Sequence, residues 1–226
     1  MYVFYLHGFA SSPQSAKAAF FSERLAACGV RMHCPDFNEP DFSTLTVSRM
    51  LRQLEEHLAA LPPGDVVLVG SSLGGLVAVE AAARRVSEAR HPITRLVLLA
   101  PAVELEWDKW AEVGPRGIPA WRENGDIEVF HHAYDAPRRL RFGFYEDANC
   151  YHAAAERLVQ PLLIFQGRQD ESVSPAVVEA FARAQPRATL FMLEDGHQLK
   201  NSLDFIWRET SRALFPDGGS LVAGSR

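Results

Sequence analysis

Three side chains that together could perform nucleophilic catalysis each follow an apolar run of strand length. In chain order they are Ser72, Asp170 and His197. A serine hydroxyl becomes a strong nucleophile when a histidine removes its proton and a carboxylate orients that histidine. Residues just beyond parallel strands can lie together, because the carboxyl ends of such strands meet at one edge of the sheet. The sequence therefore predicts Ser72 as nucleophile, His197 as general base and Asp170 as its orienting acid.

The segment around Ser72 predicts a sharp turn between a strand and a helix. An apolar run over 66–69 leads into a G-x-S-x-G turn at 70–74, and an alanine-rich helix follows. Gly70 and Gly74 lack side chains where the strand and the helix approach each other closely, and this crowding exposes the serine hydroxyl. A phosphate-binding turn at a helix N-terminus is the alternative for this pattern. The flanking strand and helix favour the nucleophile.

Two backbone N–H groups are predicted to stabilise the negative charge that develops on a substrate carbonyl oxygen. Leu73 follows the nucleophile and would supply one donor, and Phe9, in the loop after the first predicted strand, would supply the other. Gly8 lets this loop approach the substrate, and His7 is expected to hold the loop by hydrogen bonding. A second catalytic base or a metal ligand is the alternative for His7, but no partner ligands stand at a useful spacing.

Two other acids compete with Asp170 for the role of orienting acid. Glu171 is its neighbour, and Asp195 stands two residues before His197. The position of Asp195 favours a local turn, a common role for aspartate in loops. An acid and a histidine directly after successive strands favour Asp170 with His197.

Short β-rich runs alternate with helical runs along the chain, a pattern typical of a mainly parallel sheet covered by helices. The predicted strands cover residues 2–6, 30–33, 66–69, 95–99, 162–165 and 189–193. The predicted helices cover residues 15–28, 44–61, 73–88, 175–184 and 198–214. Several strands are nearly continuous hydrophobic runs, as expected when helices cover both faces of a sheet. The sequence thus predicts one α/β domain over residues 1–226, with a flexible Gly- and Ser-rich tail at 216–226.

The alternation breaks between the strand ending near Leu99 and the strand starting near Leu162. Aromatic and charged residues mix there without a clean period, and the segment is too long for an ordinary loop. We predict a lid or cap over 102–157, whose aromatic side chains either wall an acyl pocket or form the core of the insertion itself. Its basic cluster could bind an anionic substrate or lie on a solvated face. The residues of that cluster are Arg138, Arg139 and Arg141.

Composition excludes several classes of function. The net charge is −5, which provides no basic field for nucleic acid. No apolar stretch approaches bilayer length, and the three cysteines lack C-x-x-C spacing, which predicts neither a disulfide framework nor a zinc site. We expect a cytoplasmic protein with a small-molecule substrate, no nucleic-acid partner, no membrane span, no metal and no cofactor. The oligomeric state is not predicted.

Four short motifs along the chain carry a resemblance to a known family. They are His7-Gly8-Phe9-Ala10-Ser11-Ser12-Pro13 with Ser15-Ala16-Lys17, Gly70-Ser71-Ser72-Leu73-Gly74-Gly75, Gly167 to Asp170, and Gly196-His197. Together they resemble the α/β hydrolases, and in particular the small bacterial YqiA-type esterases. The resemblance implies an α/β-hydrolase fold and hydrolysis of a carboxylic ester or thioester through an acyl-enzyme, with no metal or organic cofactor. The segment after Pro101 is longer than this branch predicts, so no substrate identity follows from it.

Three functions remain open on this basis. A carboxylesterase or thioesterase acting on a small-to-medium acyl group is the leading prediction. A peptidase or amidase of the same fold would use the same residues, with His197 protonating the leaving amine. A non-catalytic ligand receptor of this fold usually lacks one member of the triad, whereas candidates for all three are present here.

Overall fold

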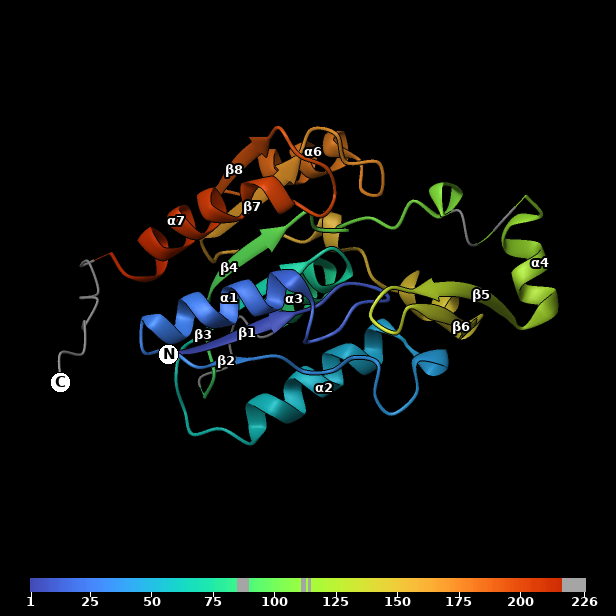
Figure 1. Ribbon diagram of the computed structural model, residues 1–226, viewed down its shortest axis with the longest axis horizontal. Helices are drawn as coiled ribbons and strands as arrows, with labels where there is room; N and C mark the ends of the chain where they lie inside the picture. The colour runs from blue at the N-terminus through green and yellow to red at the C-terminus, as the bar shows by residue number, and fades with distance from the viewer. Residues whose placement is uncertain (85–89, 111–112, 114, 217–226) are drawn as a thin grey trace.

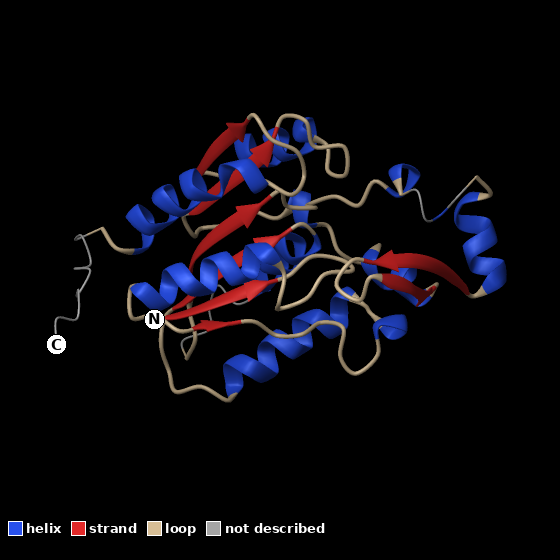
Figure 2. Cartoon of the chain, in the orientation of Figure 1, coloured by secondary structure: helices blue, strands red, loops and turns tan. Residues whose placement is uncertain are grey.

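The computed structural model describes residues 1–84, 90–110, 113 and 115–216. At its centre lies a six-stranded sheet in the order β2-β1-β3-β4-β7-β8, and every adjacent pair is parallel. The strands are β1 (Tyr2–Leu6), β2 (Met32–His33), β3 (Val66–Ser71), β4 (Ile93–Leu99), β7 (Leu162–Gly167) and β8 (Ala188–Leu193). Figures 1 and 2 show that these strands point the same way, so their carboxyl ends share one edge. The predicted parallel sheet is confirmed.

Helices cover both faces of the sheet. They are α1 (Ala16–Ala27), α2 (Val47–Ala59), α3 (Leu73–Arg84), α6 (Pro175–Ala184) and α7 (Leu203–Leu214). Successive strand residues point to opposite faces, and in β1 the side chains of Val3 and Tyr5 pack in the cluster that contains residues of α1 and α7. Phe4 and Leu6 pack in the cluster that contains α2, α3 and α6. Because both faces are buried, the strands are apolar at nearly every position.

Local sequence sets several of the helix boundaries. The Ser15 side chain accepts a hydrogen bond from the backbone of Ala18 and caps α1, and Thr46 caps α2 in the same way. Pro175 occupies the first turn of α6, where its missing N–H costs nothing. The predicted helix over 73–88 corresponds to α3, and its residues 85–88 lie outside the described part of the chain.

The prediction that the last helix begins at Gln198 is wrong, because α7 begins at Leu203. Leu199 has φ of 53° and is followed by a short 3-10 turn, η5 (Lys200–Ser202). A right-handed helix does not continue through a left-handed residue. The segment between β8 and α7 is therefore a loop, and this loop carries His197.

The segment between β4 and β7 contains regular structure that the sequence pattern did not predict. It comprises η2 (Trp107–Lys109), α4 (Gly117–Asn124), β5 (Asp126–His131), β6 (Ala136–Arg141), α5 (Gly143–Ala148) and η4 (Ala153–Ala155). β5 and β6 form an antiparallel hairpin. Most hairpin residues are exposed, with Val129, His131 and Leu140 buried, so the alternation is too weak to read. Figure 1 shows the hairpin and α4 beyond the carboxyl edge of the main sheet.

The aromatic side chains of this insertion pack mainly on one another. Trp121 is fully buried, and its indole N–H donates to the carbonyl oxygen of Leu140. The Trp107 ring lies 4.9 Å from the rings of both Trp110 and Tyr145. These contacts form a core within the insertion, which continues into the main core on the α2 and α3 face of the sheet. The predicted tail over 216–226 lies outside the described residues from 217 onward.

Candidate active site

Ser72 lies on a strained turn between β3 and α3. Its φ is 53°, a left-handed conformation that non-glycine residues adopt only where the surrounding structure enforces it. Its N–H donates to the carbonyl of Leu99 at 3.0 Å, and its own carbonyl accepts from Gly75 at 2.8 Å. A β-carbon at Gly70 would lie 2.5 Å from a backbone oxygen of Gly74, and one at Gly74 would lie 2.0 Å from the oxygen of Leu6. The turn therefore requires both predicted glycines.

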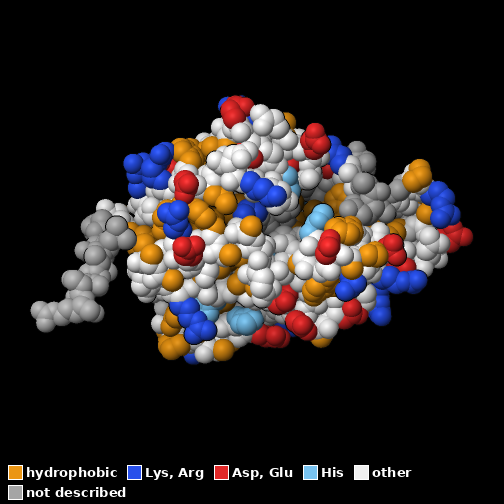
Figure 3. Space-filling model, in the orientation of Figure 1, with side chains coloured by type: hydrophobic (Ala, Val, Ile, Leu, Met, Phe, Trp, Pro, Cys, Tyr) orange, Lys and Arg blue, Asp and Glu red, His pale blue; other side chains and the backbone are white. Residues whose placement is uncertain are grey.

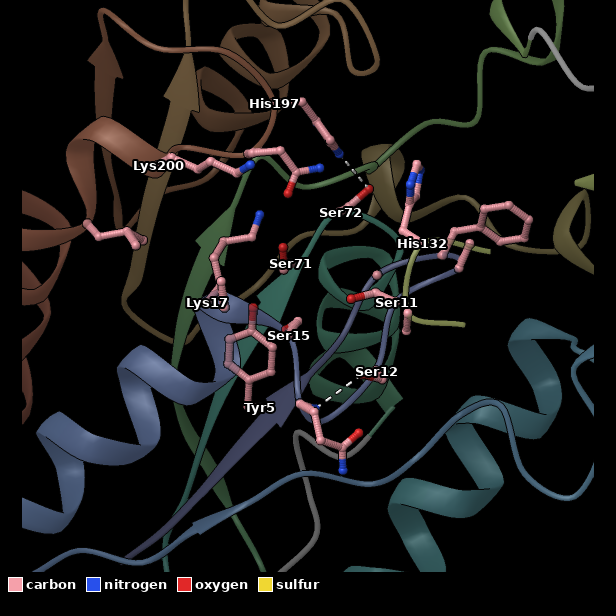
Figure 4. A pocket seen from close by; sticks show the side chains of 18 residues that line it. Tyr5, Ser11, Ser12, Ser15, Lys17, Ser71, Ser72, His132, His197 and Lys200 are labelled. Atoms are coloured by element: carbon pink, nitrogen blue, oxygen red, sulfur yellow. Dashed lines mark hydrogen bonds between the residues drawn. The ribbon is translucent and has the colours of Figure 1, made fainter. Parts of the chain in front are cut away.

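The side chains of Ser72, His197 and Asp170 form a continuous hydrogen-bonded series. The distance from Ser72 Oγ to His197 Nε2 is 3.1 Å, and His197 Nδ1 lies 2.9 Å from Asp170 Oδ2. With Nδ1 facing a carboxylate, the imidazole proton belongs on Nδ1, which leaves Nε2 free to accept from the serine hydroxyl. Figure 4 shows the His197 side chain pointing toward Ser72, with a dashed line marking the hydrogen bond between them, among the residues that line a cavity. The structure thus brings together the three predicted residues.

The Asp170 carboxylate is buried and held in place on all sides. Its Oδ1 accepts from the backbone N–H groups of Ser172 and Val173, each at 2.9 Å, and its Oδ2 accepts from the Gln166 amide at 2.9 Å. Burial acts to raise the pKa of Asp170, but the hydrogen bond and charge of His197, with those from Val173 and Gln166, lower it below its ordinary value. Asp170 is therefore an ionised carboxylate at neutral pH.

The loops after β7 and β8 lie against each other, and this contact joins Asp170 to His197. A β-carbon at Gly167 would lie 2.4 Å from the carbonyl oxygen of Asp195, so only glycine permits the approach. The N–H of Gln169 donates to that same carbonyl at 3.0 Å. The close packing brings an acid from one loop to a histidine on the next.

Neither rival acid forms a hydrogen bond or ion pair with His197 within the described residues. The Asp195 side chain accepts hydrogen bonds within its own loop, from the backbone N–H groups of Gly196 and Asn201 and from the Ser202 hydroxyl. Glu171 is exposed. Asp195 is therefore a turn residue, as its sequence position suggested.

The loop after β1 packs directly on Ser72. A β-carbon at Gly8 would lie 3.1 Å from the β-carbon of Ser72. Nε2 of the buried His7 accepts from the N–H of Phe37 at 3.0 Å, so its Nδ1 carries the proton and donates to the carbonyl of Gly8 at 2.9 Å. These bonds hold the loop as predicted for His7. Within the described chain, the N–H groups of Phe9 and Leu73 donate to no protein acceptor.

Two cavities meet at Ser72 and His197. The first has a volume of about 610 Å³ and is lined by residues from the loop after β1, the first turn of α1 and the loop before α7. The second, about 320 Å³, lies beneath the insertion and is lined in part by Phe9, Trp110 and Phe130. Figure 3 shows a hollow on one face of the molecule with histidine and basic side chains at its margin. A substrate can thus extend to either side of the serine.

The arginine cluster of the insertion lies away from these cavities. Arg139 pairs with Asp126 at 2.9 Å, and the Arg138 guanidinium lies 5.0 Å from the centre of the Tyr134 ring. Neither these two nor Arg141 lines a cavity that reaches Ser72, and all three are exposed. Their side chains occupy the solvated face that was the alternative prediction.

Sequence reasoning missed three residues beside the triad. Gln166 is fully buried in β7 and donates to Asp170. Lys17 and Lys200 line the first cavity. Gln166 was recognisable only as a polar residue inside an apolar strand, and Lys17 only as part of the motif after His7. Nothing in the sequence pattern indicated Lys200.

The described residues contain no group of three or more His, Cys, Asp or Glu side chains that could hold a metal ion. Among the helices of the described part of the chain, none is both long and apolar enough to span a membrane.

The parallel sheet and its covering helices give this protein the fold of the α/β hydrolases. Est1E from Butyrivibrio proteoclasticus, in a structure with bound ferulic acid, superimposes with a TM-score of 0.77 at 21% identity, covering 95% of this chain and 88% of that one. Alpha/beta hydrolase domain-containing protein 10 from mouse superimposes with a TM-score of 0.77 at 18% identity, covering 96% and 90%. The predicted α/β-hydrolase fold is confirmed.

The chain belongs to the family described as Uncharacterised protein family (UPF0227), which matches residues 2–211. It is also 27% identical over 164 residues to the AMB antimetabolite synthetase AmbE of Pseudomonas aeruginosa. That match covers 68% of this chain and only 8% of the synthetase. The likeness therefore concerns a small part of a much longer protein.

Proposed function

We propose that this protein is a serine hydrolase that cleaves a carboxylic ester or thioester through an acyl-enzyme intermediate. The observation that carries the proposal is the series of hydrogen bonds from Ser72 through His197 to Asp170, with distances of 3.1 and 2.9 Å. Together with the position of this half-buried serine on a strained turn that lines both cavities, it supplies an activated nucleophile. The ionised Asp170 keeps the imidazole in the tautomer that accepts the serine proton.

In the first half of the reaction, Ser72 Oγ forms a bond to the carbonyl carbon while His197 Nε2 takes the hydroxyl proton. The oxyanion accepts hydrogen bonds from the free N–H groups of Phe9 and Leu73, which are worth several kcal/mol, on the order of 3, in the transition state. The tetrahedral intermediate then breaks its bond to the leaving oxygen or sulfur, which receives the proton from His197.

In the second half, water attacks the acyl-enzyme. His197 removes a proton from that water, and when the intermediate breaks its bond to Ser72 Oγ, His197 returns the proton to that oxygen as the carboxylic acid is released. Asp170 remains ionised throughout and stabilises the imidazolium formed in each half. Every step uses groups within this site, and no metal or organic cofactor enters.

Two further observations support an ester substrate. The cavities on either side of Ser72 leave room for both halves of an ester. The structure of the similar Est1E contains bound ferulic acid, a carboxylic acid. We propose further that the insertion acts as a cap, since Trp110 and Phe130 line the cavity next to the serine.

Labelling with a fluorophosphonate probe tests the nucleophile. We expect a covalent adduct that mass spectrometry maps to Ser72, and loss of labelling in the Ser72→Ala and His197→Ala variants. Ser211→Ala, on α7, is the control that should label like the wild type. An adduct elsewhere, or unchanged labelling of Ser72→Ala, would refute the assignment.

Matched substrates then define the reaction. We expect turnover of p-nitrophenyl esters and of an acyl thioester, and slower turnover of the corresponding anilide. A clear preference for the anilide would instead indicate the amidase alternative. Tight retention of an intact ester without turnover would indicate a receptor.

A further inference from the structure

The larger cavity beside Ser72 is basic on one side. Of the three lysines in the chain, Lys17 and Lys200 both line it. Lys17 comes from the first turn of α1, and Lys200 from the 3-10 turn that precedes α7. Figure 4 shows both side chains entering the cavity on the side of Ser72 that is opposite His132. Residues distant in the sequence thus bring two ammonium groups to one cavity next to the nucleophile.

Neither lysine forms an ion pair or hydrogen bond with a protein group in the described part of the chain, and Lys17 is half-buried. The two acids that act most strongly on Lys17 are Asp170 and Asp195. Both carboxylates already have their own donors: Asp170 those from His197 and its neighbouring loop, and Asp195 those of its own turn. The ammonium groups are therefore available to a ligand.

The two lysines also act on each other. Burial lowers the pKa of Lys17 to about 8; Asp170 and Asp195 oppose that effect, and the charge of Lys200 adds to it. At neutral pH, Lys17 is mostly charged and sits in a poorly solvated position near a second cation. Such an arrangement is unfavourable by itself and becomes favourable when an anion enters between the two charges.

We propose that this cavity binds a carboxylate or phosphate group of the substrate between Lys17 and Lys200, while the ester carbonyl lies at Ser72. This inference rests on the proposed hydrolase function and narrows its substrate class to esters that carry a negative charge. Charge-assisted hydrogen bonds from ammonium groups are stronger than neutral ones and give selectivity over uncharged esters. The volume of about 610 Å³ is within the usual range for small-molecule sites.

Binding to the Ser72→Ala variant tests the inference without turnover. The probes are the p-nitrophenyl monoester of glutarate and p-nitrophenyl valerate, which share a five-carbon acyl chain and differ by one terminal carboxylate. By calorimetry we expect the monoester to bind about tenfold more tightly or better. Equal affinity for the two probes, together with equal affinity in the second pair of probes described below, would overturn the inference.

Variants of the lysines provide the second test. We expect Lys17→Met and Lys200→Met each to lower kcat/KM for the glutarate monoester by about tenfold, and to change that for the valerate ester by less than about threefold. Arg52→Met, on the exposed side of α2, removes a surface charge and should leave both values as in the wild type. Equal losses for both esters would show that the lysines act only through the fold and would overturn the inference.

A second pair of probes locates the charge within the substrate. Phenyl valerate and 4-carboxyphenyl valerate place it on the alcohol half, whereas the glutarate monoester places it on the acyl half. A lysine-dependent preference for the charged ester in either pair supports the inference and shows which half of the substrate enters the cavity. No such preference in either pair overturns the inference.

The two proposals fail in different ways. Selective binding of anionic probes by Ser72→Ala, without hydrolysis by the wild type, would uphold the anion site and overturn the hydrolase. Equal hydrolysis and equal binding of charged and neutral esters would uphold the hydrolase and overturn the anion site.

Discussion

The two cavities that meet at Ser72 differ in whether their lysine side chains are paired with an acidic side chain. Beneath the insertion, Lys109 lies 2.5 Å from the carboxylate of Glu106, so its charge is neutralised. Beside α1, the half-buried Lys17 and the exposed Lys200 have no such partner within the described residues, and only Lys17 is poorly solvated. Cations held in poorly solvated positions are normally paired. In the cavity beneath the insertion, a protein carboxylate already neutralises the lysine. In the cavity beside α1, no carboxylate of the described residues does so, and by our proposal the substrate supplies the anion.

The two cavities also have different structural origins. The lysine-lined cavity is built mainly by the loop after β1, by α1 and by the loop after β8. The other is closed by Trp110 and Phe130 of the insertion. The Phe9 ring contacts Trp110 at 5.0 Å between ring centres, so the insertion packs on the loop that carries the proposed oxyanion donor. One cavity would set the charge of the substrate and the other its apolar shape.

We expect the largest effect from a change in the proposed catalytic triad, which both cavities adjoin. Asp170→Asn should lower kcat by about 10³- to 10⁴-fold, because the neutral amide no longer fixes the tautomer of His197 or stabilises its charged form. Steady-state kinetics with the glutarate monoester and the valerate ester should show the same loss for both. A larger loss for Glu171→Gln than for Asp170→Asn would move the acid role to Glu171.

Trp110→Ala tests the cavity beneath the insertion. Loss of the indole from this cavity should lower kcat/KM for the valerate ester by about tenfold, because an apolar contact is lost. The preference for the charged ester should stay the same, because the lysines lie on the other side of Ser72. If Trp110→Ala changed the ratio of kcat/KM for the glutarate monoester to kcat/KM for the valerate ester, the cavities would not act independently.

The pH dependence of KM tests the charge of Lys17. Its pKa is lowered to about 8, chiefly by burial, so its ammonium group is present below that pH and is lost above it. KM for the glutarate monoester should therefore rise by several-fold, about three to ten, between about pH 7 and pH 9.5. The valerate ester is the control within the same protein. The rise should disappear in Lys17→Met, and a rise of the same size for both esters would contradict the assignment.

The smallest expected effect is on stability. The pKa of Lys17 falls from its ordinary 10.5 to about 8 on folding, so the folded protein holds this proton less tightly than the unfolded chain. The resulting cost is complete below pH 8, decreases as the pH rises toward 10.5 and is absent above it. Lys17→Met should therefore raise the free energy of unfolding by about 1–2 kcal/mol near pH 7. Urea unfolding at pH 7 and pH 10 measures the difference in the free energy of unfolding between the variant and the wild type. A variant that is less stable than the wild type at pH 7 would show that Lys17 is needed for the fold.

Much of the fold was predictable because the strands are apolar on both faces and the helices carry clear caps and periodicity. The same reasoning failed where one residue interrupts a regular pattern. Leu199 is left-handed, and its amino-acid type gives no sign of that conformation, so the start of α7 was placed too early. The hairpin β5–β6 was missed because its few buried residues do not produce a readable alternation.

Some residues of the candidate site were likewise predictable from the sequence, and others were not. The chain order and the position just beyond a strand predicted that Ser72, Asp170 and His197 lie together, as they do, because parallel strands bring their carboxyl ends to one edge. The choice between Asp170 and its rivals depended on tertiary packing, in which Gly167 admits the next loop at close range. The sequence also drew attention to three clustered arginines, although in the structure they are exposed and line neither cavity that reaches Ser72.

The sequence by itself determined the fold class, the order of the catalytic candidates and the turn that exposes the serine, because each depends on patterns local to one strand and the loop after it. Only the tertiary structure decided which acid faces His197 and which cations line the cavity beside Ser72. Lys17 and Lys200 lie at opposite ends of the chain, and they share a cavity because α1 and the loop before α7 meet on the same side of the sheet. Side-chain proximity of that kind depends on how whole elements pack, and no spacing along the chain encodes it.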